Sequence, residues 1–483
     1  MRAHRWDVAA AFGAGFRAAA LLALLSCAPG ASVGGELKIR PSALPDPLPE
    51  ADGYRGIWYA NQPSGDEYRF KYSGGLATYP QQHVPIAYYA AEVDKTFFVY
   101  GGTPPDANRL LHMVSYFDHG TGTVPRPRIL LDKQTDDAHD NPTLMLDGAG
   151  HLWVFSNAHG TGRPAYLHRS KRPYSIDAFE HVLTTNFSYS QPWHLEPEGF
   201  CFLHTRYVQG MRFLFWQHSA DGRTWGPRQP LARIAQGHYQ ISWREGRRIG
   251  TAMNYHPLEG GLNARTNLYY LETRDAGKTW TTVDGRALKL PLAEPHNPAL
   301  LRDYESEELL VYLKDLGFDA AGHPVILYLT SKGYASGPAN DPRVWRTAQW
   351  SGTRWEFREV TRSDNNYDFG SLYLEADGTW RIVGATEAGP QAYNTGGEIA
   401  MWTSGDQGRT WKKLALLTRN SPFNHTYPRR PVHAHPDFYA LWADGHGREP
   451  SPSRLYFTDR QGRHVWRLPP RMPGPTAKPE IVD

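Results

Sequence analysis

Short apolar runs separated by turn residues recur along the chain. Three of them, Phe213–Trp216, Leu268–Leu271 and Ile399–Trp402, are rich in aromatic and aliphatic side chains. Such residues favour β-strands, and each run is followed closely by aspartate and glycine, which favour turns. Beyond the N-terminus there is no apolar run of about 18 residues, the length that a membrane-spanning helix needs. The pattern therefore predicts many short strands joined by tight turns, with neither long helices nor a membrane span.

The same turn sequence follows each of these three runs. It reads Ser-Ala-Asp-Gly-Arg-Thr-Trp at 219–225, Thr-Arg-Asp-Ala-Gly-Lys-Thr-Trp at 273–280 and Ser-Gly-Asp-Gln-Gly-Arg-Thr-Trp at 404–411. The Asp side chain can accept backbone N–H groups within the turn, the Gly supplies a positive φ, and the Trp packs beneath. This motif is the Asp box, and we interpret it as a structural hairpin device rather than a catalytic element.

Similar strand-and-turn units without the full box begin near Leu111, Ala165, Val325 and Arg454. With the three boxed units they make seven, at a spacing that suits four-stranded blades. The sequence thus predicts an all-β fold, a seven-bladed β-propeller of four-stranded antiparallel blades with Asp-box turns, as a single domain over residues 40–483. We also expect the strand at 56–59 to pair with the last unit and the proline-rich tail after Leu468 to be loose.

The first 30 residues have the three parts of an export signal. Basic residues at the start are followed by an apolar stretch from Ala18 to Leu25 and then by Ser-Cys-Ala-Pro-Gly at 26–30. We predict a signal peptide at residues 1–30 and export to the periplasm, the outer membrane or the medium. The sequence at 24–27 is similar to a bacterial lipobox, so two routes stay open: lipidation of Cys27, or cleavage and release. Either way Cys201 is left alone, and no intramolecular disulfide can form.

Charge and composition narrow the choice of partner. The formal net charge is only +3, from 52 basic and 49 acidic residues, so no overall field attracts nucleic acid. An anionic partner must therefore be bound by a local pocket. The 16 Trp and 27 Tyr residues suit surfaces that stack on sugar rings. We expect a monomer that binds a carbohydrate.

A hairpin centred on Ala149 carries two histidines at matching positions. His139 and His159 are equidistant from the turn. Residues directly opposite each other in an antiparallel pair have Cβ atoms about 4.5 to 5.5 Å apart. The two imidazoles should therefore meet at one rim.

The next unit repeats this arrangement with a different pair. Its turn is centred between Pro197 and Glu198, and Tyr189 and Arg206 are equidistant from that centre. Neighbouring blades run the same way, so both pairs should lie at the same face of the propeller. A bulge in either hairpin would spoil this registration.

These features together resemble the BNR-repeat family, which includes seven-bladed polysaccharide lyases that cleave ulvan. The resemblance rests on the Asp boxes, on both hairpins and on the segment 427–442, and it runs from about residue 50 to the end. In those lyases two histidines on one hairpin act as acid and base, and a Tyr and an Arg on a later hairpin assist. The positions that match here are His139, His159, Tyr189 and Arg206.

These residue types suit β-elimination at a uronic acid. The C5 proton is only weakly acidic until the adjacent carboxylate is neutralised, which the guanidinium of Arg206 can do by binding it in a fork. One neutral imidazole can then take the C5 proton, while the other imidazole or Tyr189 protonates the departing O4. The sequence does not distinguish base from acid.

Further polar residues are candidates for holding sulfate or sugar hydroxyls at the same face. They are Asn141, His238, Tyr239, His256 and Arg265. Each can equally be a turn or edge residue satisfied by the backbone. We expect no required cofactor and no metal among the site residues. His433 and His435 share one side of a strand and His425 is near, but no cysteine accompanies them, so a structural metal ion there has no further support.

The first functional hypothesis is a polysaccharide lyase that cleaves a uronate-containing, ulvan-like polysaccharide, sulfated or not. A sialidase-type glycoside hydrolase is the second, because sialidases share the Asp boxes and the propeller. No sialidase-like Arg-Ile-Pro signature occurs; Arg40-Pro41 and Arg55-Gly56-Ile57 are the nearest sequences. The third is a non-catalytic carbohydrate-binding propeller, since a fold shared by many activities does not settle function.

Overall fold

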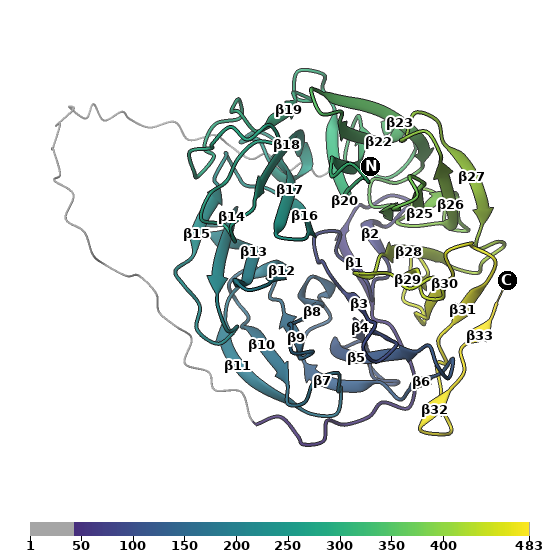
Figure 1. Cartoon of the computed structure of the whole chain (residues 1–483). Helices are drawn as coiled ribbons and strands as arrows, with labels where there is room; N and C mark the ends of the chain where they lie inside the picture. Colours follow the sequence, from purple (N-terminus) through teal and green to yellow (C-terminus); the bar gives the residue numbers. More distant parts are fainter. Residues whose placement is uncertain (1–42, 483) are drawn as a thin grey trace, which may run out of the picture. The chain divides into compact units, whose positions relative to one another are not determined.

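The part of the chain that the structure describes, residues 43–482 of a computed structural model, is built almost entirely from β-strands (Figure 1). Within these residues the helices are short 3-10 turns: η1 (Ala138–Asp140), η2 (Gly261–Ala264) and η3 (Pro338–Asn340). No helix of this part is long and apolar enough to cross a membrane. The predicted signal peptide and its Cys27 lie outside the described residues.

Seven antiparallel sheets form the blades, and the predicted seven-bladed propeller is confirmed. From the first strand outward, blade 1 contains β3 (Ala87–Ala90), β4 (Lys95–Gly102), β5 (Leu111–Asp118) and β7 (Arg128–Asp132). Blade 2 contains β8 (Pro142–Leu146), β9 (Leu152–Ser156), β10 (Ala165–Ser170) and β11 (Phe179–Thr185). Blade 3 contains β12 (Ser188–Leu195), β13 (Gly199–Val208), β14 (Met211–Ser219) and β15 (Gln229–Ala232).

The other four blades follow the same plan. Blade 4 contains β16 (Gln240–Glu245), β17 (Arg248–Tyr255), β18 (Thr266–Thr273) and β19 (Leu300–Arg302). Blade 5 contains β20 (Leu310–Phe318), β21 (Pro324–Ser331), β22 (Arg343–Trp350) and β23 (Trp355–Ser363). Blade 6 contains β24 (Gly370–Leu374), β25 (Trp380–Glu387), β26 (Glu398–Ser404) and β27 (Lys412–Leu416). Blade 7 contains β28 (Asn424–Arg429), β29 (Ala440–Gly445), β30 (Leu455–Thr458), β31 (Val465–Arg467) and β33 (Glu480–Ile481).

The hydrophobic core lies between adjacent blades. Trp153 of blade 2 packs edge-on against Phe200 of blade 3, with ring centroids 5.1 Å apart. Trp193 of blade 3 packs in the same way against Trp243 of blade 4, at 5.3 Å. Large aromatic side chains therefore fill the wedge between neighbouring sheets and contribute much of the burial that stabilises the ring.

The Asp boxes lie in the turns between the third and fourth strands of blades 3, 4 and 6. In the first box, the Oδ1 atom of Asp221 accepts hydrogen bonds from the backbone N–H groups of Arg223 and Thr224, both at 2.8 Å. Asp275 and Asp406 accept from the backbone four residues later, at 2.9 Å. The box glycines have φ angles of 71°, 92° and 74°, the left-handed region that favours glycine. The predicted structural role is confirmed.

The expected closure of the ring by residues 56–59 is met only in part. Gly56 forms bridges to Ser453, beside the last unit, and to Gly102, but β1 (Trp58–Pro63) pairs with β2 (Phe70–Gly75) instead. The separate expectation that the tail is loose is wrong. β32 (Thr476–Ala477) pairs with β6 (Val124–Pro125) beside blade 1, and β33 extends blade 7. The tail thus covers sheet edges that would otherwise be open.

Candidate active site

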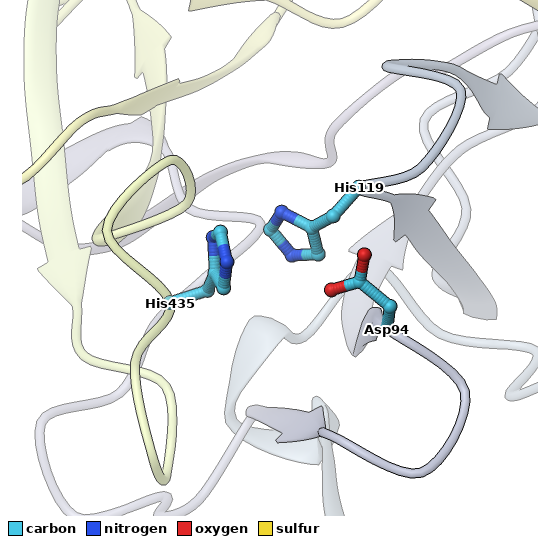
Figure 2. Close-up of side chains that lie close together, drawn as sticks. All are labelled: Asp94, His119 and His435. Atoms are coloured by element: carbon cyan, nitrogen blue, oxygen red, sulfur yellow. The ribbon is translucent and has the colours of Figure 1, made fainter.

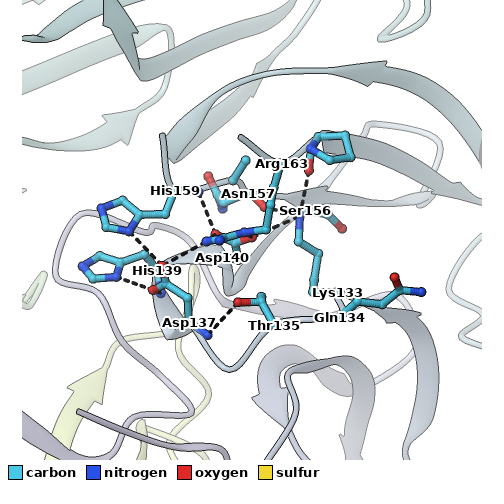
Figure 3. Close-up of polar contacts among 12 residues, drawn as sticks. Lys133, Gln134, Thr135, Asp137, His139, Asp140, Ser156, Asn157, His159 and Arg163 are labelled. Carbon is cyan, nitrogen blue, oxygen red and sulfur yellow. Dashed lines mark hydrogen bonds and ion pairs between the residues drawn. The ribbon is translucent and has the colours of Figure 1, made fainter. Parts of the chain in front are cut away.

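His139 and His159 stack on each other at the open end of the β8–β9 hairpin (Figure 3). The hairpin has the predicted register, with Pro142 opposite Ser156. His139 lies in η1 just before β8, and His159 follows β9. Their ring centroids are 3.9 Å apart with an interplanar angle of 17°. The two imidazoles therefore meet, as the hairpin geometry predicted.

Asp137 holds both imidazoles, one with each carboxylate oxygen. Its Oδ1 atom is 2.5 Å from His139 Nδ1, and its Oδ2 atom is 2.8 Å from His159 Nδ1. An ionised carboxylate can only accept, so we assign the proton of each ring to Nδ1, which leaves Nε2 as an acceptor when the ring is neutral. Burial by itself would raise the pKa of Asp137, but the charges and hydrogen bonds of the two histidines hold that pKa well below its usual range.

The two histidines differ at their other nitrogen. His139 Nε2 lies 2.9 Å from the Tyr72 hydroxyl and 2.7 Å from the Tyr79 hydroxyl, and its side chain is 4% exposed. Burial, with the nearby charge of His159, lowers the pKa of His139 to about 4. His159 Nε2 has no partner among the described residues, and its side chain is 25% exposed. His159 is therefore the imidazole that can reach a ligand.

A second carboxylate fixes this arrangement from behind. Asp140 is fully buried and accepts from the backbone N–H of His159 at 2.6 Å. Arg163 bridges the two acids: its Nε donates to Asp140 at 2.8 Å and its Nη2 donates to Asp137 at 2.9 Å (Figure 3). Lys133 Nζ lies 3.4 Å from Asp140. Although Asp137 and the two histidines are close enough together to hold a metal ion, Arg163 already neutralises the carboxylate.

The expectation that Tyr189 and Arg206 face each other is wrong. The β12–β13 turn is centred on Pro197, with Leu195 opposite Gly199, and a bulge between Ser188 and Gln191 places Ser188 opposite Thr205. Tyr189 lies in this bulge with a φ of 53°, and its ring remains 6.2 Å from that of His139.

Arg206 points to the other side of β13. Side chains alternate along a strand, so Arg206 and the next residue, Tyr207, lie on opposite faces. The Tyr207 ring is 5.9 Å from the ring of His159. Arg206 instead lies near the charged or titratable groups of Arg228 and His204. The structure thus brings three of the four predicted catalytic residues together and leaves Arg206 apart from them.

Arg212 occupies the position beside the tyrosines. It is the cross-strand partner of Tyr207 on β13 and β14, and its Nε donates to the Tyr207 hydroxyl at 3.0 Å. Its charge also acts on Tyr189 and Tyr239. Tyr207 and Arg212 are equidistant from the turn at 209–210, so the rule that paired the histidines would have found this pair too.

Three basic side chains gather near this hairpin without a counterion. Lys71 of β2, Arg212 and Arg265 form no ion pair with any described carboxylate. Arg265 donates to the Tyr367 hydroxyl and to the Leu262 carbonyl, both at 3.1 Å. Burial, and then the charges of the two arginines, lower the pKa of Lys71 to about 7. Unneutralised cations beside a partly exposed imidazole suit an anionic ligand.

The five further candidates divide into two groups. Tyr239, His256 and Arg265 gather beside Tyr189: the Tyr239 ring lies 5.3 Å from Tyr189 and 5.0 Å from His256, and Arg265 lies over it at 4.9 Å. Asn141 instead donates to the carbonyls of the loop at 76–79. His238 is also bound by the backbone.

Lys71, Tyr72 and Tyr79 were missed by the sequence analysis because nothing local marks them.

The folded protein holds His238 in its neutral form, so the free energy of unfolding depends on pH. Its Nδ1 donates to the Asn254 carbonyl and its Nε2 accepts from the Ile234 N–H, so protonation would break the second bond. Burial lowers the pKa of His238 from 6.5 to about 4. The unfolded chain then takes up the proton first, so the free energy of unfolding falls as the pH drops from 6.5 towards 4, by up to about 1.4 kcal/mol per pH unit for this group.

Urea unfolding at several pH values between 7.5 and 4 would test this expectation. The His238→Gln variant should lose less stability across this range than the wild type, because one buried imidazole no longer titrates. Parallel pH profiles of the two proteins would contradict it.

Fold and site together define an Asp-box β-propeller with a histidine pair on the face opposite its Asp boxes. In each blade the first strand begins and the second ends at the face of His139 and His159, whereas the boxes follow the third strand at the other face. Residues 86–363, more than half of the chain, match the family described as BNR repeat-containing family members, and the protein belongs to this family.

Several named proteins are similar to this chain. It is 24% identical over 272 residues to "Ulvan Lyase-PL25" of Pseudoalteromonas sp. (strain PLSV), covering 47% of this chain and 55% of that protein. It is 21% identical over 363 residues to an ulvan lyase of Nonlabens ulvanivorans, covering 65% and 72%. A solved PL25 ulvan lyase structure superposes with a TM-score of 0.67 at 18% identity, covering 85% of this chain and 96% of that one. The match to the first relative thus spans little more than half of that protein's length.

Proposed function

We propose that the protein is an exported polysaccharide lyase that cleaves a uronate-containing, ulvan-like polysaccharide by β-elimination. The observation that carries this proposal is the free Nε2 of His159, held by Asp137 beside the unneutralised Arg212. Elimination at a uronate needs a proton acceptor and a cation for the carboxylate, and the site offers both. We further propose that it acts as a monomer and that the catalytic step needs no cofactor.

Each residue of the site has a role that its contacts support. Arg212, with Lys71 and Arg265 nearby, binds the uronate carboxylate and so makes the C5 proton more acidic. The Nε2 atom of neutral His159 accepts that proton, the C4–O4 bond breaks, and a double bond forms between C4 and C5. Burial raises the pKa of Tyr189 well above its usual value, so its phenol keeps its proton, and its hydroxyl, which has no hydrogen-bond partner among the described residues, is available to donate to the departing O4. His139 is a positioning residue, since it stacks on His159 and its Nε2 is occupied.

The comparisons support the same reaction. Relatives of this family are named ulvan lyases, and a solved PL25 lyase holds a glucuronate-containing oligosaccharide, -[GlcA(1-4)Rha3S]-. An anionic sugar polymer of this kind fits the cations that lack a counterion here.

The direct test is incubation of the purified protein with a panel of uronate-containing polysaccharides, ulvan first. A lyase leaves an unsaturated uronate, whose conjugated double bond absorbs in the ultraviolet. Reducing ends without that absorbance would indicate hydrolysis and favour the sialidase-type alternative. Binding without either product would favour the non-catalytic propeller.

Arg212 and Arg206 offer a matched pair for testing which arginine binds the carboxylate. Replacing Arg212 by methionine should lower kcat/KM by roughly 10- to 100-fold, the cost of losing a hydrogen bond to a charged group. Arg206→Met should change it by less than about threefold, because this side chain lies on the other face of β13. Steady-state kinetics on the best substrate measure both. A larger loss in Arg206→Met than in Arg212→Met would contradict the assignment.

A further inference from the structure

A second group of metal-ligating side chains lies at the opposite face, where blade 1 meets blade 7 (Figure 2). Asp94 lies in the turn between β3 and β4, and His119 directly follows β5, both in blade 1. His435 lies between β28 and β29 of blade 7. One ligand atom from each of the three lies within 4.8 Å of the other two. None of them belongs to the proposed active site.

His119 has a buried nitrogen without a partner. Its Nε2 atom is 2.9 Å from the Thr96 hydroxyl, which fixes the ring. Its Nδ1 atom is buried and has no hydrogen-bond partner among the described residues. A buried polar atom without a partner costs free energy, and a metal ion would satisfy it. A hydrogen bond from the other ring nitrogen is also what orients metal-binding histidines.

Among the described residues, no positively charged side chain neutralises Asp94. Its Oδ1 atom accepts from the Tyr89 hydroxyl at 3.0 Å, and no described lysine or arginine forms an ion pair with it. Asp437 adds a second carboxylate close by, 4.0 Å from His435 Nδ1. In the Asp137 group, by contrast, Arg163 supplies the positive charge. The carboxylate at the blade seam is therefore not neutralised by a described base, whereas the carboxylate that holds His159 is.

His435 approaches His119 from the other blade. The centroids of the two imidazole rings are 3.8 Å apart. His435 Nδ1 accepts a long hydrogen bond, 3.1 Å, from the Asp437 N–H, which metal coordination through that atom would replace. Two imidazole nitrogens and one carboxylate oxygen are a donor set that zinc accepts, with a position left for water or for Asp437.

We propose that Asp94, His119 and His435 bind a zinc ion that clasps blade 1 to blade 7. These blades come from opposite ends of the propeller sequence. Beside the cluster they are joined by backbone hydrogen bonds from Tyr89 N to Val432 O and from Val432 N to Ala87 O, both at 2.9 Å. A metal bridge at this seam would stabilise the closed ring without touching the opposite face.

Only one histidine of the pattern His433, His435 and His425 takes part. The His433 ring packs against Tyr88 at 5.4 Å. Both nitrogens of His425 are occupied, by the Trp442 Nε1–H at 2.9 Å and the Ser421 hydroxyl at 3.0 Å. The other proposed ligands come from blade 1, so sequence spacing could not have indicated this site.

The test is titration of chelator-treated protein with zinc chloride, followed by calorimetry and by competition with a chromogenic zinc chelator. The wild type should bind one zinc ion per chain and unfold at a higher temperature with zinc than with EDTA. His119→Ala and His435→Ala should weaken binding by at least about tenfold and lose that thermal shift. His433→Ala, in the same loop as His435, should behave as the wild type.

Asp94→Asn serves as a second variant if removal of His119 prevents folding, because it keeps the shape of the side chain and removes its charge. It should also weaken zinc binding. Absence of zinc binding by the wild type would overturn the proposal. So would binding that His433→Ala weakens as much as His435→Ala does, or that survives in all three ligand variants.

Discussion

His159→Ala should lower kcat by about 10²- to 10⁴-fold, the contribution typical of a positioned general base or acid. The side chain offers the only partly exposed Nε2 of the histidine pair, and Asp137 holds its Nδ1 at 2.8 Å. Removing it takes away the proton acceptor but leaves Asp137 bound to Arg163 and His139. The protein should therefore remain folded and should bind its substrate nearly as well. Initial rates of ultraviolet absorbance on ulvan measure the effect.

His151→Ala is the matched control for this variant. His151 belongs to the same hairpin but lies at its turn, on the face away from the pair, where Nδ1 contacts the Ser170 carbonyl at 2.9 Å. It should keep kcat within about threefold of the wild type. Equal losses in the two variants would indicate a general effect on the fold, and unchanged activity in His159→Ala would remove this residue from the mechanism.

Asp140→Asn should lower the free energy of unfolding by about 3 to 5 kcal/mol, the cost of breaking a buried charge pair from one side. Asp140 is fully buried and neutralises Arg163 at 2.8 Å and Lys133 at 3.4 Å. The Lys133 side chain is only 2% exposed, so its ammonium cannot turn to water when the carboxylate is gone. It would keep only its hydrogen bonds to the carbonyls of Asn157 and Pro164.

Arg172→Gln is the control for the buried pair. Arg172 also binds an aspartate, Asp177, at 2.9 Å, but its side chain is 71% exposed. Water solvates such a pair well, so its loss should cost less than about 1 kcal/mol. Urea unfolding of both variants at neutral pH gives the comparison. Equal destabilisation by the two substitutions would show that Asp140 contributes no more than a surface charge.

The local features of this protein could be predicted from its sequence. In the Asp boxes Asp275 and Asp406 accept hydrogen bonds from backbone N–H groups four residues later, so the motif itself specifies these bonds. The histidine pair also depends on one short hairpin, whose register follows from its turn. The number of blades follows from the repeat of such local units, because every unit must bury its hydrophobic faces against its neighbours.

The remainder depends on contacts between distant segments, which only the tertiary structure decides. Because of the bulge at Tyr189 and the alternation of side chains along β13, Arg212 rather than Arg206 lies at the site. No local sequence signal predicts that bulge. The N-terminal hairpin brings Tyr72 and Lys71 to the site from outside the blades, and the ring brings His435 to His119 across more than 300 residues. By itself the sequence determined the blades, their turns and the histidine pair, because hairpin geometry is set within a few residues. Closure of the ring decided which cations and which metal ligands come together, because only closure brings residues so far apart in the chain into contact.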